Sequence, residues 1–553
     1  MQRYVVKLNL EGMRRTADFW LLAAILIIGG MMALTSCSER NNPVVSPDEP
    51  QVENLADVTV MIYGSGGGSL DPNLITKLHR IYDADPASFE RVKVAVQYKF
   101  SQPKKVKGWP DDETKNEFYA TLEREGEEYV ERNAGGRNYF RWMGAKGNAT
   151  LSYVVDPEQT LYRQSKTSWL PDDNMDITHP DSLASFIRWA AQQCPAREYV
   201  LLMTDHGRGF LPHEEADPNE IIITRSMVED MGHDRRHFTA KTLHQGIQRS
   251  GIPITTLYLD LCMMNTLEYQ FEMKDLCDYI VASTYSTQGV GFYDDLVDCL
   301  AKYPQDMAAA LTRTIELAME QQEKGKTADP LYMDYTVTRT DRLDQLGSVM
   351  REFTDRLCET YENGTPEQQQ AIDQVTAKAV KVSAMNPFYD VAKYMSAIMR
   401  ALPEVYGDDF YEELKKAFND CLVAQVYSNY LKDRDYQVDY SVLMGTQGHY
   451  MWGRWMPTES GVYEITTIWS YEADGTLYEY NVNDPVFNDE DDTFTYTPEL
   501  VATSTWAGTL ASVYGTTVFD KTVGWSRWIR MNRQEPTLWC KNDFEDELDD
   551  DDQ

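Results

Sequence analysis

Residues 258–264 read Y-L-D-L-C-M-M, an apolar run that reaches Asp260 and then Cys262. A second apolar run lies upstream, where residues 199–210 read Y-V-L-L-M-T-D-H-G-R-G-F and reach His206. Short runs of this kind are typical of strands that are buried on both faces of a parallel sheet. Chemistry in such sheets lies beyond the carboxyl ends of the strands. Two neighbouring strands would therefore place an imidazole base beside a thiol.

Alternating strands and helices surround these two runs. Strands are predicted at 57–63, 91–98, 198–204, 255–261 and 278–284, and helices at 181–194, 239–249 and 265–276. This alternation predicts an α/β/α sandwich with a mostly parallel central sheet. Further along the chain, helices are predicted at 305–324, 342–361, 366–382 and 410–431, with a strand at 332–338.

The chain divides into six predicted segments by composition. Residues 57–300 form the α/β domain, residues 301–440 continue it with helices, and residues 441–541 are aromatic and β-rich. The aromatic strands favour a core, with a carbohydrate or peptide surface as the alternative. Residues 542–553 are an acidic run, which is typical of a disordered tail. Residues 1–36 and 37–56, described next, are a leader and a tether.

The N-terminal segment has the proportions of a signal peptide. Residues 20–34 are apolar and follow two arginines, and the run ends in L-T-S-C at Cys37. This ending resembles the lipobox of bacterial lipoproteins, which implies that Cys37 is lipidated. Translation starting at Met13 would give a more ordinary leader. The residues after Cys37 lack an early Asp, which favours the outer membrane, so we expect a lipid-anchored protein of the cell envelope.

Composition excludes some classes of partner and site. The 553 residues carry 52 basic and 88 acidic side chains, a formal net charge of −36. This balance excludes nucleic-acid binding, which needs a basic surface. The eight cysteines contain no C-x-x-C pair, so no zinc ribbon is indicated. His233 and His237 are four residues apart without an intervening catalytic Glu, which favours a surface helix over a metal site.

Cys262 and His206 have the residue types that acyl transfer requires. A cysteine is a nucleophile as its thiolate, and a neighbouring imidazole can take the proton and later protonate the leaving amine. The backbone N–H groups of Gly207 and Cys262 are candidate donors to the oxyanion. A lone Cys at a strand end is more often a small buried hydrophobe, so the pairing with His206-Gly207 carries the interpretation.

The sequence around His206-Gly207 and Cys262 resembles the clostripain family of cysteine peptidases. This family lies in the group that includes caspases, gingipains and legumains. The resemblance covers about residues 57–293 and is strongest in T-D-H-G-R-G-F at 204–210 and D-L-C-M-M at 260–264. It implies a caspase-like fold, with His206 as general base and acid and Cys262 as nucleophile. No cofactor is required, and the resemblance allows calcium as an optional one. The implied partners are protein or peptide substrates.

The resemblance also implies a role for Asp260 in the S1 pocket, which binds the side chain before the scissile bond (P1). A carboxylate there would recognise Arg or Lys. Val290 stands where the family often has an acid, which weakens that preference. Self-cleavage between the two strands is a further hypothesis, with Arg225, Arg235 and Arg236 in the interval.

Two functions follow from the sequence. The first is an exported, lipid-anchored cysteine endopeptidase that uses a His206–Cys262 dyad. The alternative is a weak or inactive surface lipoprotein that keeps the peptidase fold and binds peptide or glycan.

Overall fold

The computed structural model describes residues 55–66, 77–100, 149–210, 227–287, 292–325, 332–444, 450–457, 463–471, 476–488, 493–503 and 514–532, the longer ranges with short gaps. The predicted leader, the lipidation site Cys37, the residues Arg225, Arg235 and Val290, and the acidic tail lie outside the described residues. Within the described part of the chain, no helix is long and apolar enough to cross a membrane.

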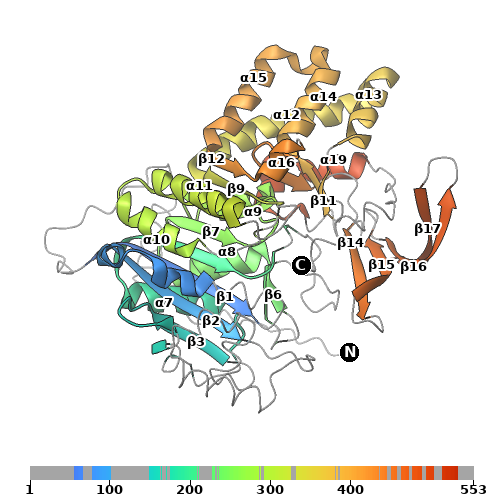
Figure 1. Ribbon diagram of the computed structural model, residues 1–553. Helices are drawn as coiled ribbons and strands as arrows, with labels where there is room; N and C mark the ends of the chain where they lie inside the picture. The colour runs from blue at the N-terminus through green and yellow to red at the C-terminus, as the bar shows by residue number, and fades with distance from the viewer. Residues whose placement is uncertain are drawn as a thin grey trace, which may run out of the picture. The chain divides into compact units, whose positions relative to one another are not determined.

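An eight-stranded sheet lies at the centre of the fold (Figure 1), in the order β12-β9-β8-β7-β4-β1-β2-β3. These strands are β12 (Leu422–Tyr427), β9 (Asp334–Arg339), β8 (Tyr279–Ala282), β7 (Thr256–Asp260), β4 (Ala196–Thr204), β1 (Ala56–Gly66), β2 (Val92–Phe100) and β3 (Ala149–Val154).

The five inner strands β2, β1, β4, β7 and β8 pair in parallel. The outer pairs β2–β3, β8–β9 and β9–β12 are antiparallel. The prediction of a mostly parallel sheet is therefore confirmed. Strand β2 lies on one side of β1. The later strands β4, β7 and β8 follow one another on the other side of β1, so the order of the strands reverses at β1. In sheets of this kind the ligand site lies at the carboxyl ends beside such a reversal.

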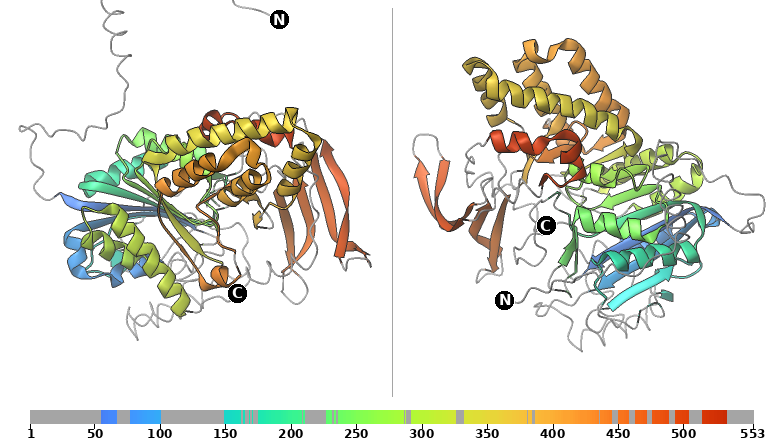
Figure 2. Two further views of the ribbon diagram at one scale, coloured as in Figure 1. Left: turned by 90° about the horizontal axis from the view of Figure 1, so that it is seen from above. Right: turned by 180° about the vertical axis from the view of Figure 1, so that it is seen from behind.

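Helices cover both faces of the sheet, as Figure 2 shows. One face carries α7 (Pro180–Gln193), α8 (Ala240–Ser250), α9 (Leu267–Met273) and α12 (Leu343–Asn363), and the other carries α10 (Tyr293–Lys302) and α11 (Met307–Gly325). Strand β7 contributes to both cores, because side chains alternate along a strand. Leu257 and Leu259 lie in the core under α7 and α8, and Tyr258 lies in the core under α10 and α11.

The second half of the chain adds helices and three small sheets. The helices are α13 (Pro366–Ala377), α14 (Val391–Ala401), α15 (Pro403–Cys421) and α16 (Asn429–Asp433). Strands β10 (Lys381–Ser383), β11 (Asn386–Asp390) and β13 (Val442–Met444) form one sheet, and β5 (Met227–Asp230) pairs with β6 (Arg236–Phe238). The predicted β-rich region forms a four-stranded sheet of β14 (Tyr450–Pro457), β15 (Tyr463–Tyr471), β16 (Thr476–Asn488) and β17 (Thr493–Thr503).

The predicted helix over 410–431 is wrong in its second half. Helix α15 ends at Cys421, and Leu422–Tyr427 is the edge strand β12, which pairs with β9. Ser428 then caps α16 through its side chain, which accepts from the backbone N–H of Leu431. The β-branched Val423 and Val426 favour a strand, and pairing with β9 decides between the two structures.

Within the region that was predicted to be β-rich, residues 518–531 instead form α18 (Val518–Val523) and α19 (Trp525–Met531). Thr517 caps α18, and Gly524 ends it in the left-handed conformation with φ of 75°. Trp525 and Trp528, three residues apart, are fully buried against the helices that cover the sheet. That spacing places two large apolar side chains on one helix face.

Candidate active site

The two predicted site residues follow neighbouring strands at the same level of the sheet. Thr204 at the end of β4 pairs with Asp260 at the end of β7. His206 and Cys262 each lie two residues beyond this pair. A Cβ added to Gly207 would lie 2.4 Å from the carbonyl oxygen of Cys262 and 3.1 Å from its backbone nitrogen. The backbone after His206 therefore packs directly against the backbone of Cys262.

The His206 segment is held by the strand that returns to it. His206 is half-buried, and its carbonyl oxygen accepts from the backbone N–H of Val228 at 3.2 Å. Gly207 makes a β-bridge to Met227. Val228 itself has φ of 50°, an uncommon conformation for a β-branched residue. The start of β5 thus fixes the backbone at the His206 carbonyl group and at Gly207.

Cys262 differs from the other described cysteines. It is half-buried, whereas Cys194, Cys277, Cys299, Cys358 and Cys421 are buried. Burial raises the pKa of Cys194 and of Cys358 to about 11, and that of Cys421 to about 12. These thiols are small buried hydrophobes. Among the described cysteines, Cys262 is the one that keeps partial exposure to solvent.

A residue that the sequence did not single out contacts the thiol. The backbone N–H of Thr287 donates to Cys262 Sγ at 3.4 Å, and Thr287 Oγ1 lies 3.9 Å from the same sulfur. Thr287 therefore contacts the sulfur through both its backbone and its side chain. Thr287 lies 25 residues beyond Cys262, so sequence spacing gave no signal for it.

The chain turns sharply after Cys262. Met263 has φ of 62°, and its N–H donates to the carbonyl oxygen of Tyr285 at 2.8 Å. The N–H of Asn265 donates to the carbonyl oxygen of Ser283 at 2.9 Å. A non-glycine residue in this region stores backbone strain, which the surrounding hydrogen bonds must offset. The segment after β8 therefore holds the turn that presents the thiol.

Asp334 holds that segment in turn. Its Oδ1 accepts from the Ser283 hydroxyl at 2.8 Å and from the N–H groups of Thr284 at 2.8 Å and Tyr285 at 3.0 Å. The side chain is fully buried, and burial raises the pKa of its carboxyl group. Asp334 begins β9, so a neighbouring strand supplies the anchor for the loop opposite Cys262.

Asp260, the predicted S1 residue, is buried and paired inside the chain. Its Oδ2 accepts from Lys77 Nζ at 2.7 Å and from the Tyr293 hydroxyl at 2.8 Å. The Thr204 hydroxyl lies 3.4 Å from the same oxygen. Its contact with substrate stays a prediction. Neither Lys77 nor Tyr293 was recognised from the sequence.

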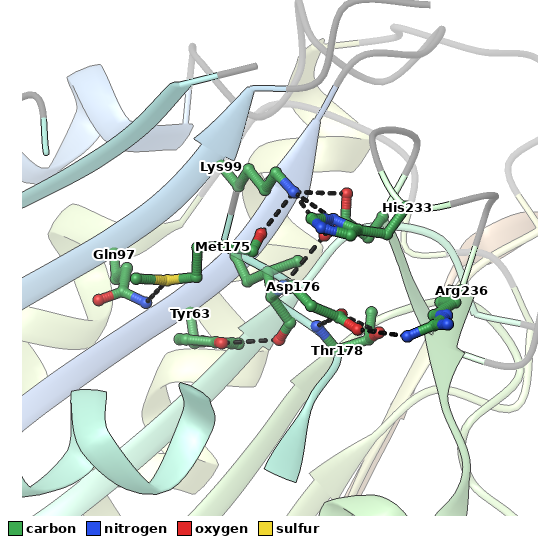
Figure 3. Close-up of polar contacts among 10 residues, drawn as sticks. Tyr63, Gln97, Lys99, Met175, Asp176, Thr178, His233 and Arg236 are labelled. Carbon is green, nitrogen blue, oxygen red and sulfur yellow. Dashed lines mark hydrogen bonds and ion pairs between the residues drawn. The ribbon is translucent and has the colours of Figure 1, made fainter. Parts of the chain in front are cut away.

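One group of side chains has the composition of a metal site. Ligand atoms of Asp176, Asp230 and His233 lie within 4.8 Å of one another. Figure 3 shows that Lys99 projects into this group, with Nζ at 2.6 and 2.8 Å from the Asp230 carboxylate and 2.9 Å from His233 Nδ1. The Lys99 ammonium thus takes the place that a calcium ion would need, so these residues do not fit the ion.

The structure around Asp176, Asp230 and His233 contradicts one prediction. The surface helix expected around His233 and His237 does not form, since His233 lies in a turn and His237 lies on β6. Arg236, also on β6, donates to Asp176 at 3.1 Å. Burial alone would raise the pKa of Asp176, but hydrogen bonds from Thr178 and Arg236 outweigh it and lower that pKa. The polar group therefore ties β6 to the segment before α7.

Similarity to known proteins identifies the family of this chain. The chain is similar to the solved structure of a secreted C11 cysteine protease from Bacteroides thetaiotaomicron, "iotapain" (12% identity, TM-score 0.47, 70% of this chain and 94% of that one). It is also similar to an inactive zymogen C11 protease from Parabacteroides distasonis (14% identity, TM-score 0.41, 85% and 98%). No curated protein matches it. The model of the clostripain family matches residues 145–452. Because this match spans more than half of the 553 residues and includes both His206 and Cys262, the chain belongs to the clostripain family.

Proposed function

We propose that this protein is a cysteine endopeptidase in which Cys262 is the nucleophile and His206 is the general base and acid. The observation that carries the proposal is the packing of Gly207 against the Cys262 backbone, with the added Cβ 2.4 Å from the Cys262 carbonyl oxygen. This packing brings the strand end that bears the imidazole to the strand end that bears the accessible thiol. Protein or peptide chains are the substrates.

The reaction proceeds through a thioester. His206 takes the thiol proton, Cys262 Sγ forms a bond to the scissile carbonyl carbon, and the C–N bond breaks as His206 gives the proton to the leaving amine. Water then attacks the thioester with His206 as base, which releases the acid product and the thiol. The backbone N–H of Thr287, 3.4 Å from Cys262 Sγ, holds the sulfur in place for this attack.

The oxyanion of each tetrahedral intermediate needs donors at the site of attack. We assign this role to the N–H groups of Gly207 and Cys262. Their backbones are adjacent, since a Gly207 Cβ would lie 3.1 Å from the Cys262 nitrogen. The missing side chain at Gly207 is what allows the two backbones to lie this close together.

The test is hydrolysis of a library of internally quenched peptides by the purified full chain. Cys262→Ala and His206→Ala are expected to abolish cleavage, and Cys299→Ala, which removes a buried thiol on α10, to retain it. A thiol-reactive peptide should label Cys262 in the unaltered chain. Cleavage that survives in Cys262→Ala would contradict the proposal. Absence of both cleavage and labelling would favour the alternative, a surface lipoprotein that binds peptide or glycan.

Self-processing between the two strand ends is part of the proposal. Of the three arginines in the interval, Arg236 is disfavoured, because it pairs with Asp230 in the β5–β6 ribbon and its side chain donates to Asp176. A peptidase binds an extended and unpaired backbone. Mass spectrometry should therefore find a cut elsewhere in the interval in active protein and an intact chain in Cys262→Ala. Active protein that stays a single chain would contradict self-processing.

We also propose that Cys37 is lipidated and anchors the protein in the cell envelope, at the outer membrane. The support is the sequence L-T-S-C after an apolar leader. Metabolic labelling with a fatty acid should mark the unaltered chain and not Cys37→Ala, which should appear in the soluble fraction. A labelled Cys37→Ala chain would rule out this anchor.

A further inference from the structure

The side chain of Asn265, three residues beyond Cys262, is buried and fully hydrogen-bonded. Its Oδ1 accepts from Gln270 Nε2 on α9 at 2.8 Å. Its Nδ2 donates to three buried acceptors from three other segments: the Tyr440 carbonyl oxygen at 2.8 Å, the Thr284 hydroxyl at 3.0 Å and the Thr336 hydroxyl at 3.2 Å. A buried polar group whose donors and acceptors all have partners specifies one arrangement of its neighbours.

The backbone of Asn265 is held by the second half of the chain. Its carbonyl oxygen accepts from the N–H of Val442 at 3.2 Å and from the Ser441 hydroxyl at 2.9 Å. The next residue, Thr266, makes a parallel β-bridge to Val442, the first residue of β13. Asn265 and Ser441 are 176 positions apart in the sequence. A distant segment therefore closes directly onto the turn that bears the thiol.

Tyr440 is strained where it meets this turn. It has φ of 77°, an uncommon conformation for a bulky residue. Its N–H donates to Gln425 Oε1 at 3.2 Å, and its hydroxyl donates to Gln270 Oε1 at 2.7 Å. Backbone strain persists only where surrounding contacts over-determine it. Since Met263 is strained as well, with φ of 62°, the hydrogen bonds of Asn265 connect two strained stretches of backbone.

The small sheet of β10, β11 and β13 also contacts the segment after His206. Gly209 has φ of 80°, and a Cβ there would lie 2.7 Å from the ring of Phe388 on β11 and 3.1 Å from the Met263 carbonyl oxygen. Phe388 pairs with Met444 on β13. The segments that bear the imidazole and the thiol therefore both contact the same small sheet.

We propose that Asn265 is a positioning residue for Cys262, and that residues 440–442 of the second half of the chain are a structural part of the catalytic centre. The inference rests on the proposed peptidase function. Asn265 acts on the thiol through the turn between them, which directs Cys262 Sγ toward the scissile carbonyl carbon. Reaction rates depend steeply on the placement of reacting groups. Loss of such placement lowers kcat and kcat/KM together and leaves KM unchanged.

The test uses the full chain and measures kcat and KM for one internally quenched peptide, together with the rate at which a thiol-reactive peptide labels Cys262. Asn265→Ala is expected to lower kcat by about tenfold to a hundredfold, the range for misplaced reacting groups. Its KM should not change. Labelling should slow by a similar factor, because the same sulfur makes the attack.

Asn532→Ala is the matched control. Asn532 and Asn265 are both 1% exposed, and the side-chain amide of Asn532 donates to Asp373 on α13 at 2.9 Å. Its removal should lower the melting temperature and leave kcat and the labelling rate unchanged. The comparison therefore separates loss of positioning from loss of stability.

Tyr440→Phe tests the same contact from the other segment, because it removes the hydroxyl that donates to Gln270 and keeps the backbone. It should lower kcat by about fivefold, a magnitude typical of one hydrogen bond. The double variant Asn265→Ala/Tyr440→Phe should lose little more than Asn265→Ala alone, since both changes act on one network.

The possible outcomes are distinct. If Asn265→Ala does not fold, Tyr440→Phe decides alone. An unchanged kcat in folded Asn265→Ala, full activity in Tyr440→Phe, or an equal loss of kcat in Asn532→Ala overturns the inference while the unaltered chain stays active. An unaltered chain that neither cleaves peptides nor is labelled at Cys262 overturns the proposed peptidase function, and this inference with it.

Discussion

Gly207 is the residue at which the two halves of the candidate site meet. A methyl group there would lie 2.4 Å from the Cys262 carbonyl oxygen and 2.9 Å from Leu261 Cβ. Both neighbours directly follow β7, so the backbone that bears the thiol would have to move. We expect Gly207→Ala to lower kcat/KM by about a hundredfold, since small displacements of reacting groups have effects of this size. Peptide hydrolysis by the purified variant measures it.

Gly251 provides the matched control for this substitution. It ends α8 with φ of 68°, and a Cβ there would meet nothing within 4 Å. Gly251→Ala should therefore cost roughly 1–2 kcal/mol of stability through backbone strain and leave kcat/KM unchanged. Equal activity in Gly207→Ala and Gly251→Ala would show that the contact at Cys262 has no catalytic consequence.

Asp334 acts on the thiol through the loop that it holds, so it is a positioning residue. Its Oδ1 accepts three hydrogen bonds from residues 283–285. Asp334→Ala should lower kcat/KM by about tenfold to a hundredfold, as expected for misplaced catalytic groups, and should slow labelling of Cys262. Asp334→Asn keeps the acceptor oxygen and should restore most of the activity. If both variants were equally impaired, the carboxyl charge rather than its acceptor oxygen would be the important feature.

The sequence predicted His206 and Cys262 because each follows an apolar run at the end of a strand, a local signal. It did not predict Lys77, Thr287 or Asp334. Lys77 contacts Asp260 across 183 residues of sequence. Which distant side chains reach the carboxyl edge depends on the order of strands in the sheet, and a single sequence does not specify that order.

At the scale of elements, prediction succeeded for strands with buried neighbours on both sides and failed at the edges. All five residues of β7 are buried, so its apolar run has no polar interruption. Edge strand β12 is half-buried throughout, and its pattern continues the helical pattern of α15. The aromatic residues near the C-terminus suggested strands. In α19, however, Trp525 and Trp528 are spaced for a helix face.

Helix α19 is expected to contribute strongly to stability. Trp528 is fully buried, and its indole N–H donates to the Tyr394 hydroxyl at 3.0 Å. Trp528→Ala should destabilise the protein by about 3–5 kcal/mol, the usual cost of removing a large buried aromatic residue. Arg527→Ala, on the exposed side of the same helix, should cost less than about 1 kcal/mol. Thermal unfolding compares the two, and equal melting temperatures would contradict the docking of α19.

At the scale of the whole molecule, Asp390 links the C-terminal half of the chain to the turn after Cys262. Its Oδ1 caps α14 by accepting from the N–H of Lys393, and its Oδ2 accepts from the N–H of Asp439. The segment that follows reaches the site, because the N–H of Val442 donates to the carbonyl oxygen of Asn265. Protonation of Asp390 is therefore expected to affect the contact between the C-terminal half of the chain and the turn after Cys262.

Burial raises the pKa of Asp390 from 3.8 to about 6. The folded state thus binds this proton more tightly than the unfolded state does. The resulting stabilisation, about 3 kcal/mol, is fully present below the unfolded pKa and is lost as pH rises through the folded pKa. About half of it remains at pH 5, and almost none remains at pH 8. Asp390→Asn keeps a neutral side chain at every pH, so its contribution should not change with pH.

Melting temperatures of the unaltered chain and Asp390→Asn at pH 5 and pH 8 test this expectation. The stability of Asp390→Asn relative to that of the unaltered chain should increase between pH 5 and pH 8. The expected increase is about 1 kcal/mol. The unaltered chain has 88 acidic residues, and the variant lacks one of them. Comparing the two chains at each pH therefore cancels the titration of the other 87. A difference in melting temperature that is the same at both pH values would mean that Asp390 is ionised at pH 5 in the folded protein. The buried carboxylate would then be stabilised by its two N–H donors and by Lys393, whose Nζ lies 3.5 Å away.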